Sequence, residues 1–532
     1  MASSDTTKID ALVIGAGISG LAAIKSMRDA GFDVLAVERT GDVGGLWHYK
    51  EKAYGVMKFT YINVSKHNYC FSDYPMPSEL PDYVHNEDMQ AYIRSYVQHF
   101  ELHSHIHFLT QVNSVQKKDG VYEVVTEAVE EDSQGVITPT GKTRVYECKY
   151  LAICTGHHAK PRMPSFPGLD TFKGKAYHSV DYNDAVYNDI IEKKVVVIGV
   201  GNSAIDVACN AASVGRCKPV VLSTRSGTWV APNYIAGYPI DHYACRLFMM
   251  LPWRVATYIV ESVFCAMQGN PKKWKLNPKM HAMQTQPTVS PTVIHHIQRK
   301  EIKVVPNVQK IDGNRVVFED GSSAEADHLI LCTGYKVDLP YLPKEMKDGI
   351  IDENNNDIKL YKGVFGPDED HTLAFIGFIQ PASGGLTAMS EIQARWWAEL
   401  CKGSVKLPPK PDMKESVSKE LALSQSRWFK SERHTIQRDP LVYCDEIATF
   451  FGARPEFRKH PGLAWRLLLG CGGNYQYRLQ GPNQWHHAEE NVKKVPVTEM
   501  MLYGFVFSVG LLLWLAYCFV YFIMDHVLVD ED

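Results

Sequence analysis

The sequence that decides the fold is DALVIGAGISG, at residues 10–20. Its first five residues are typical of a short buried strand, with an apolar run after Asp10, and the glycines that follow, Gly15, Gly17 and Gly20, have the spacing G-x-G-x-x-G. In this pattern the first glycine permits a tight turn, the second lets a pyrophosphate approach the backbone, and the third lets a helix pack closely on the strand. Residues 10–20 therefore predict a strand, a phosphate-binding loop and the start of a helix.

The same pattern occurs a second time, as KVVVIGVGNSA at residues 194–204. Its glycines are Gly199 and Gly201, and Ala204 stands at the third position, which is an accepted variant of the motif. Each copy is followed later by an apolar strand and the triplet Cys-Thr-Gly, at 154–156 and 332–334. This internal repeat predicts an α/β fold with two Rossmann-like dinucleotide-binding domains, the second inserted into the first.

The two units differ where their second strands end. Glu38 closes the strand expected at 34–37, where a carboxylate accepts hydrogen bonds from the ribose hydroxyls of a dinucleotide such as FAD. The corresponding strand, at 219–222, leads to Arg225 and contains no acid. An arginine there is suited to the 2′-phosphate of NADPH, although an ordinary surface arginine is the alternative. The sequence therefore predicts one FAD site and one NADPH site, as in an oxidoreductase.

The predicted domain organisation follows from the repeat and from the length of the connections. A helical insertion is expected within the second domain, because the stretch between Trp229 and Val304 is too long for a connection in an ordinary Rossmann fold. Its role is left open: the insertion is expected to cover the active site, to contact a membrane, to do both, or to be an additional helical subdomain with its own small core. The parts are the first part of the FAD domain (1–155), the NADPH domain (156–331) with its insertion (about 232–295), the rest of the FAD domain (332–445), a membrane-proximal region (446–499) and a transmembrane anchor (500–524).

Composition narrows the class of protein. The chain has 532 residues, 45% of them hydrophobic and 22% charged, which is typical of globular domains, and its net charge of -4 argues against a nucleic-acid partner. The twelve cysteines are scattered without a CxxC pair, so a flavin disulfide reductase is disfavoured and a reducing compartment is expected. No histidine or cysteine spacing indicates a metal site. The oligomeric state stays open, with a homo-oligomer as one alternative.

The C-terminal segment predicts a membrane anchor. Met500–Met524 contains no charged residue and is long enough to cross a bilayer as a helix, the alternative being a buried core helix. Lys493 and Lys494 precede it, and no Lys or Arg follows. The positive-inside rule then leaves the catalytic domains in the cytosol, and the endoplasmic reticulum is the expected membrane because there is no signal peptide.

A longer motif connects the chain with a known family. Residues 172–182 read FKGKAYHSVDY and resemble the FxGxxxHxxxY signature of the flavin-containing monooxygenases, a resemblance that extends over essentially the whole chain. Asn183 departs from the Lys, Pro or Asp that usually follows the signature. The related Baeyer–Villiger monooxygenases carry tryptophan where this chain has Tyr182. His178 of the motif is expected at the seam between the domains, in a structural role rather than as a proton carrier.

Further segments carry the resemblance and the site residues that it implies. The family's GGLW segment beside the flavin corresponds to residues 44–47, its flavin-edge asparagine to Asn63, its phosphate-binding run to 223–230 and its re-entry segment to 375–380. The expected cofactor-binding residues are Gly15, Gly17, Gly20, Glu38, Gly45, Leu46, Trp47, Asn63, Gly199, Gly201, Asn202, Ser203, Ala204, Arg225, Ser226 and Gln380.

The resemblance also implies a mechanism. NADPH reduces FAD, the reduced flavin reacts with O2 to form a C4a-hydroperoxyflavin, and a soft nucleophilic nitrogen or sulfur atom of an amine or thioether takes the distal oxygen. Asn63 is the predicted catalytic residue, because its amide stabilises the site without a titrating proton; a turn cap is the alternative. Ketone oxygenation of the Baeyer–Villiger type and NADPH oxidase activity are alternatives on the same scaffold. A membrane-tethered nucleotide sensor without turnover is a further one.

Overall fold

The computed structural model describes residues 6–499 apart from 53, 159, 353–356 and 431–434, together with scattered positions between 501 and 520. Most of the predicted anchor, Met500–Met524, therefore lies outside the described residues. Within the part that the structure describes, no helix is long and apolar enough to cross a bilayer.

The first sheet has seven strands and is built around β1 (Thr6–Ile14), which contains the strand predicted at 10–14. The strand order is β3-β2-β1-β6-β5-β4, and β23 pairs with the last residues of β6. β1 is parallel to both β2 and β6, so that Ile14 lies beside Val37 and Ile153. The other strands are β2 (Val34–Val37), β3 (Ile106–His107), β4 (Thr110–Lys118), β5 (Val121–Glu131), β6 (Ile137–Ile153) and β23 (Leu373–Phe375).

The second sheet has five strands in the order β15-β10-β9-β19-β8, and every pairing in it is parallel. Its strands are β8 (Lys175–His178), β9 (Val195–Ile198), β10 (Val220–Ser223), β15 (Ile302–Val305) and β19 (His328–Leu331). All of them lie between β6 and β23 in the sequence, so the second unit interrupts the first. The α/β fold with two Rossmann-like units is thereby confirmed, as are the individual strands predicted for both repeats.

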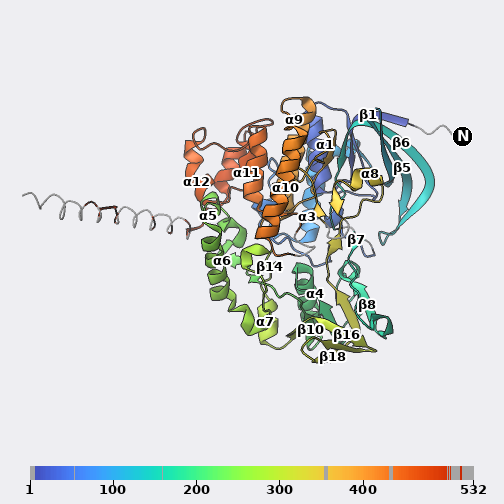
Figure 1. Cartoon of the computed structure of the whole chain (residues 1–532), viewed down its shortest axis with the longest axis vertical. Coiled ribbons are helices and arrows are strands. Elements are labelled where there is room, and N and C mark those ends of the chain that lie inside the picture. Colours follow the sequence, from blue (N-terminus) through green and yellow to red (C-terminus); the bar gives the residue numbers. More distant parts are fainter. Residues whose placement is uncertain are drawn as a thin grey trace, which may run out of the picture.

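The two units are joined by a pair of adjacent connections. β7 (Lys160–Pro161) leaves the first sheet and pairs antiparallel with β20 (Tyr335–Lys336), which returns from the second. Figure 1 shows the two units one above the other, with β7 between them. The His178 ring contacts the carbonyl oxygen of Gly334 through Nε2 at 3.1 Å, beside these connections. His178 therefore lies at the seam between the units, as the signature motif predicted.

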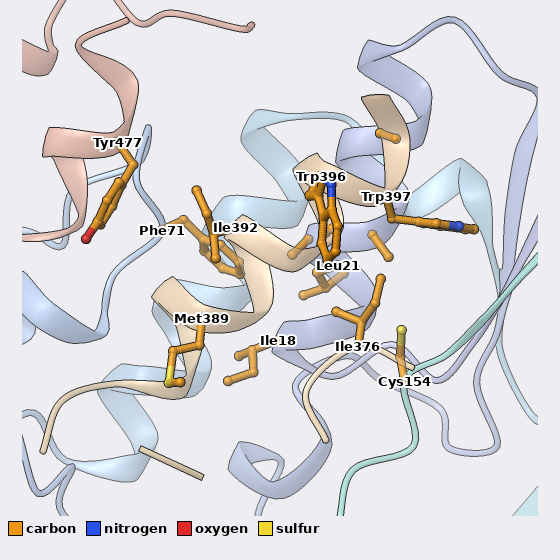
Figure 2. Packing of buried hydrophobic residues seen from close by; sticks show 14 of the residues in the cluster. Ile18, Leu21, Phe71, Cys154, Ile376, Met389, Ile392, Trp396, Trp397 and Tyr477 are labelled. Atoms are coloured by element: carbon orange, nitrogen blue, oxygen red, sulfur yellow. The ribbon is translucent and has the colours of Figure 1, made fainter. Parts of the chain in front are cut away.

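The core of the first unit lies between α1 (Ile18–Asp29) and α9 (Leu386–Lys402). Ile18 and Leu21 of α1 face the same cluster as Met389 and Trp396 of α9 (Figure 2). α9 is buried on all sides, as expected for a helix enclosed by other elements rather than lying on a surface. Truncation of Trp396 to alanine would cost about 3–5 kcal/mol of stability. This packing brings the C-terminal part of the chain onto the first glycine loop.

The stretch 232–295 contains the expected helices, although two pairs of short strands accompany them. Its helices are α5 (Arg246–Met249), α6 (Trp253–Gln268) and α7 (Val293–Gln298), and β14 (Thr288–Val289) pairs with β11 (Val230–Ala231). Arg246 forms a buried ion pair with Asp445, at 2.6 Å, and so connects the insertion to α11 (Pro440–Phe450). The other α-helices among the described residues are α2 (Lys66–Tyr69), α3 (Asn86–His99), α4 (Asn202–Ser213), α8 (Lys344–Lys347), α10 (Lys410–Arg427), α11 (Pro440–Phe450), α12 (Ala464–Leu469) and α13 (Ala488–Lys494).

The remaining strands are short and lie at the edges of the two units. They are β12 (Tyr234–Ile235), β13 (Tyr238–Pro239), β16 (Val308–Asp312), β17 (Arg315–Phe318), β18 (Ser323–Glu325), β21 (Ile351–Asp352), β22 (Asp357–Ile358), β24 (Gln380–Pro381) and β25 (Gln437–Arg438). The pair β24–β25 is parallel and places Gln380 beside Gln437.

Candidate active site

Both glycine loops begin with a glycine whose left-handed backbone passes close to a carbonyl group. Gly15 has φ +102°, and a Cβ atom there would lie 2.8 Å from the carbonyl oxygen of Cys154. Gly199 has φ +125°, and its Cβ would lie 2.3 Å from the carbonyl oxygen of Cys332. Side chains are therefore excluded at both positions by conformation and by contact. Each loop therefore packs against the backbone of the Cys-Thr-Gly triplet of its own unit.

The helices that follow the loops have N-termini without a side-chain cap. Gly17 precedes α1 and Gly201 precedes α4, and neither helix receives a capping hydrogen bond from a side chain. The first N–H groups of a helix have no partner within the helix, and they carry a partial positive charge. Two such helix N-termini after glycine loops fit the pyrophosphates of two dinucleotides.

The third position of the first loop has less space for a side chain than the third position of the second loop. A Cβ atom at Gly20 would lie 1.9 Å from the carbonyl oxygen of Gly15, whereas the matching Ala204 carries its Cβ in a fully buried position. The segment that contains Gly45 lies against the first loop, since a Cβ at Gly45 would come within 3.1 Å of Gly17 Cα. Backbone thus lines this loop on two sides, at distances that exclude side chains at Gly20 and Gly45.

Glu38, at the end of β2, is buried and holds the first loop in place. Its Oε2 accepts a hydrogen bond from Ala16 N (2.8 Å), and its Oε1 accepts from Thr40 N (3.0 Å) and Thr40 Oγ1 (2.9 Å). A carboxylate offers about four lone-pair sites, so capacity remains for a ribose hydroxyl. Glu38 is therefore part of the loop's own hydrogen bonding as well as a candidate ribose ligand.

The corresponding position of the second unit is open and cationic. Arg225 follows β10, is exposed, and lines a large cavity. The turn that presents it is fixed by Thr224 Oγ1, which accepts a hydrogen bond from Gly227 N at 3.0 Å, and by Ser223 Oγ, which donates to Pro306 O at 2.8 Å. A guanidinium group held at the rim of a cavity is suited to a phosphate dianion.

One cavity of about 1210 Å³ lies between the two units. Most of the predicted cofactor residues line it, whereas Gly15, Gly17, Gly20, Glu38 and Gly45 lie outside its lining. Among the predicted site residues, the lining contains Leu46, Trp47, Asn63, Gly199, Gly201, Asn202, Ser203, Ala204, Arg225, Ser226 and Gln380. The structure thus brings the flavin-edge segments of the first unit and the whole second loop to one space.

The cavity has a neutral wall, which we define as its lining residues within 46–69 and 380–386. Every one of these residues is uncharged, and Asn63 is half-buried among them. Among the described residues the Asn63 side chain has no hydrogen-bond partner, so its amide is available to a ligand. Gln380 donates through Nε2 to Oε1 of Gln286 at 3.0 Å, which joins the neutral wall to the insertion.

Burial disfavours the protonated form of two histidines near the connections between the units. His157 is buried after the first triplet, its Nδ1 lies 3.1 Å from Gly377 O, and burial lowers its pKa to about 4. Burial also lowers the pKa of His178, whose Nδ1 accepts a hydrogen bond from Val180 N. Both rings are engaged with backbone atoms, which indicates structural roles. Over the described ranges, no group of three or more His, Cys, Asp or Glu side chains is arranged to hold a metal ion.

Comparison with known proteins shows the family to which the chain belongs. The family described as flavin-binding monooxygenase-like matches residues 8–496. The chain belongs to this family. Flavin-containing monooxygenase 5 of Mus musculus is 37% identical to this monooxygenase over 503 residues, which cover 90% of each chain. The solved structure of S-allyl-L-cysteine S-oxygenase from Allium sativum is similar with a TM-score of 0.62 and 20% identity, covering 92% of this chain and 98% of its own.

A cyclohexanone monooxygenase structure in an open form shares the fold as well, with a TM-score of 0.60 and 18% identity over 83% of this chain and 97% of its own. The resemblance inferred from residues 172–182 is thereby confirmed. This monooxygenase is an oxidoreductase that depends on NADPH and O2, and its family uses FAD and NADPH. The two uncapped helix N-termini and the glycine cradle fit that pair of cofactors.

Two polar contacts of this monooxygenase were not foreseen from the sequence. Gln286 meets Gln380, and Asp241 accepts hydrogen bonds from Ser65 and Asn68, next to the segment that carries Asn63. Both Gln286 and Asp241 belong to the insertion, and both contact residues far away in the sequence. Neither residue belongs to a glycine loop or to a segment with a regular hydrophobic pattern, so the local sequence does not predict their contacts.

Proposed function

We propose that this monooxygenase transfers one oxygen atom of O2 to a soft nucleophilic nitrogen or sulfur atom of a small molecule, such as an amine or a thioether. The neutral wall is the observation that carries the proposal, because Asn63 lies in it and no charged side chain belongs to it. A nucleophile in this environment needs no general base from the protein, since the oxidising power comes from the bound flavin.

The neutral wall favours the reactive form of an amine. A protonated amine has no lone pair with which to attack an electrophilic oxygen. Transfer into uncharged, desolvated surroundings disfavours the cation and lowers the amine's pKa, so that the free base is bound. A thioether is neutral already and enters the same surroundings without an ionisation cost. The S-oxygenase of Allium sativum, which shares the fold, is named for oxygenation at sulfur.

Ketone oxygenation is the alternative, favoured by the similarity to a cyclohexanone monooxygenase. Oxygen insertion into a ketone requires the oxidant to act as an anionic nucleophile, which a neighbouring cation would favour. The described residues of the neutral wall include no cation, and the lysines and arginines that line the same cavity belong to other segments: Lys160, Arg162, Arg225 and Lys336. Tyr182, which stands where the Baeyer–Villiger enzymes have tryptophan, is buried and donates to Asn210 Oδ1 at 2.7 Å. We therefore rank nitrogen and sulfur oxygenation first.

The proposed cofactor sites follow the two loops. FAD is held by Gly15, Gly17, Gly20, Glu38, Gly45, Leu46, Trp47 and Asn63, with Gln380 at its edge, and NADPH by Gly199, Gly201, Asn202, Ser203, Ala204, Arg225 and Ser226. Within this arrangement the Asn63 amide donates and accepts hydrogen bonds at the reactive edge, where it favours oxygen transfer over release of peroxide. The proposed domain boundaries are those expected from the repeat: 1–155 and 332–445 for FAD, and 156–331 for NADPH.

We further propose that the chain is anchored in the endoplasmic reticulum membrane by residues 500–524, with its catalytic domains in the cytosol. Figure 1 shows α5, α6 and α12 on one side of the molecule. Each of these helices has an exposed apolar side chain within it or directly after it, which supports membrane contact on this side: Met250, 75% exposed, Tyr258, 73%, and Trp465, 61%. Alkaline extraction of microsomes tests the anchor. The full chain should stay with the membrane pellet, and a chain that ends at Glu499 should be released; equal extraction of both would contradict the anchor.

Product analysis tests the proposed reaction. Purified holoenzyme is supplied with NADPH, O2 and, separately, a tertiary amine, a thioether and a cyclic ketone. The expected result is N-oxide and sulfoxide formation at a kcat/KM at least about tenfold above ester formation, a difference of roughly 1.4 kcal/mol in barrier. Ester as the main product would favour the ketone reaction. NADPH consumption that yields only hydrogen peroxide with all three compounds would favour oxidase activity.

A further inference from the structure

Asp241 occupies an unusual position between two distant parts of the chain. It lies in the short 3-10 helix Ile240–Tyr243 of the insertion and is only 1% exposed. A buried carboxylate requires hydrogen-bond donors that compensate for its lost hydration. Among the described residues, the hydrogen-bond donors to the Asp241 carboxylate belong to the segment 65–68, more than 170 residues earlier, just after Asn63.

The contacts of Asp241 form a clamp on that segment. Its Oδ1 accepts a hydrogen bond from Ser65 N at 3.0 Å, and its Oδ2 accepts from Ser65 Oγ and Asn68 Nδ2, both at 2.6 Å. Hydrogen bonds to an ionised carboxylate are shorter and stronger than those between neutral groups. Three of them within four residues fix the backbone direction with which the chain leaves Asn63.

Ser65 shows that the clamp takes precedence over local structure. It is the N-cap residue of α2 (Lys66–Tyr69), a position where serine usually caps the helix with its own hydroxyl group. Here no side-chain capping bond is made, and the hydroxyl group donates to Asp241. The Ser65 hydroxyl group therefore contacts the insertion rather than the N-terminus of its own helix.

His242 completes the arrangement without turning it into a nucleophilic triad. Its Nε2 lies 3.1 Å from Ser65 Oγ, and because that hydroxyl group donates to Asp241, it accepts from His242. In a catalytic triad the carboxylate would orient the histidine, whereas here it binds the serine. The His67 ring lies 5.9 Å from the His242 ring, and burial lowers the pKa of both histidines.

We propose that Asp241 is a positioning residue for oxygen transfer, which holds Asn63 at the neutral wall and couples the insertion to the flavin side of the cavity. The inference rests on the role proposed above for Asn63. A displacement of a reacting group by about 1 Å can cost roughly 100-fold in rate, so a small shift of this segment is enough to alter the outcome of the reaction. The shift should affect oxygen transfer more than the binding of NADPH, because no hydrogen bond or ion pair among the described residues joins the second glycine loop to the clamp.

The chain provides a matched control at Asp445. This buried carboxylate also binds the insertion, through the Nε and Nη2 atoms of Arg246 at 2.8 and 2.6 Å, but none of its hydrogen bonds or ion pairs with described residues involves residues 63–68. Asp241→Asn and Asp445→Asn therefore both loosen the insertion, and only the first releases the segment that carries Asn63. A role of Asp241 in general stability predicts the same outcome for both substitutions.

The experiment measures peroxide and oxygenated product per NADPH consumed, using flavin-loaded full-length protein and a thioether. Asp241→Asn should raise the ratio of peroxide to product about tenfold, corresponding to a positional error smaller than 1 Å, with the KM for NADPH unchanged. Asp445→Asn should keep the wild-type ratio. An unchanged ratio in Asp241→Asn, or an equal rise in both variants, would overturn the inference.

Two further variants keep the test decisive. Ser65→Ala removes one of the two 2.6 Å bonds of the clamp and leaves the Ser65 N–H bond in place, so it should raise the ratio by a smaller factor even if Asp241→Asn does not fold. An unchanged ratio in Ser65→Ala would then count against the clamp. Asn63→Ala separates the two proposals: if its ratio stays at the wild-type value, the proposed role of Asn63 is wrong. If Asn63→Ala raises the ratio and the clamp variants do not, only the clamp is wrong.

Discussion

The two dinucleotide loops share a backbone and differ in their chemistry. Gly15 and Gly199 both pass under the carbonyl group of a Cys-Thr-Gly triplet, and an uncapped helix follows each loop. The first loop ends at Gly20, where there is no space for a Cβ atom, and the second ends at Ala204, which carries one. The shared part fits a pyrophosphate of either dinucleotide, so we expect selectivity between the two cofactors to come from the parts that differ.

The strand ends show this division most clearly. Glu38 is buried and bound by the backbone of its own loop, whereas Arg225 is exposed at the rim of the cavity. A buried, pre-oriented carboxylate suits a cofactor that stays bound. An exposed guanidinium group suits one that enters from solvent and leaves as part of each catalytic cycle. The difference in burial therefore parallels the difference between a resident flavin and an exchanging nicotinamide cofactor.

The largest effect is expected from substitution of the last residue of a glycine loop, which is Gly20 in the first loop and Ala204 in the second. Gly20→Ala places a Cβ atom 1.9 Å from the carbonyl oxygen of Gly15, so α1 must move away from β1. We expect a loss of about 3 kcal/mol in stability and the loss of most bound flavin, measured by thermal unfolding and by visible absorbance. The reverse exchange, Ala204→Gly, is the control. It should cost only about 1 kcal/mol and keep the flavin; similar losses in both variants would mean that the loops are not distinct.

A smaller and more selective effect is expected at Arg225. Arg225→Ala removes a charged hydrogen-bond donor to the 2′-phosphate, which is worth about 1.5–3 kcal/mol, or roughly 10- to 100-fold in the KM for NADPH. NADH lacks that phosphate and serves as the control, since its KM should be unchanged. Glu38→Gln should do the opposite and reduce flavin content with little change in the KM for NADPH. An equal rise in KM for NADH and NADPH would show that Arg225 does not contact the phosphate.

Local features of the site were predictable because they depend on neighbours in the sequence. The strands at 10–14 and 34–37 are short apolar runs bounded by glycine or by a charged residue, and both are present in the first sheet. The glycine loops follow from spacing, since the turn, the helix N-terminus and the strand end lie within about 25 residues. The same holds for Arg225, because its position relative to its strand is fixed by the repeat.

The remaining features depend on contacts that no local pattern encodes. α9 has charged residues in its sequence, yet it is enclosed, because Glu391 pairs with Arg478 at 2.6 Å inside the protein. Asp241 likewise reads as a polar residue in a connecting segment until the fold brings Ser65 to it. In both cases the partner is 87 or more residues away, so burial of the charge cannot be inferred before the tertiary structure is known.

The smallest effect concerns the residues that follow the two triplets. His157 follows the first, and burial lowers its pKa to about 4, whereas Tyr335 follows the second, and burial raises its pKa to about 12. Between about pH 4 and 6.5 the unfolded chain binds a proton at His157 that the folded chain does not, so stability falls by about 1 kcal/mol per pH unit as the pH decreases. Above pH 6.5 this contribution to stability is fully present.

His157→Asn isolates that contribution, because its amide keeps a donor for Gly377 O and cannot be protonated in this range. The urea midpoint of this variant should depend less on pH than that of the wild type, while Tyr335→Phe should keep the wild-type dependence. The slope that remains in His157→Asn belongs to other buried histidines, such as His67. A wild-type slope in His157→Asn would mean that the first triplet, like the second, is insensitive to pH. The two domain connections would then differ in sequence but not in titration.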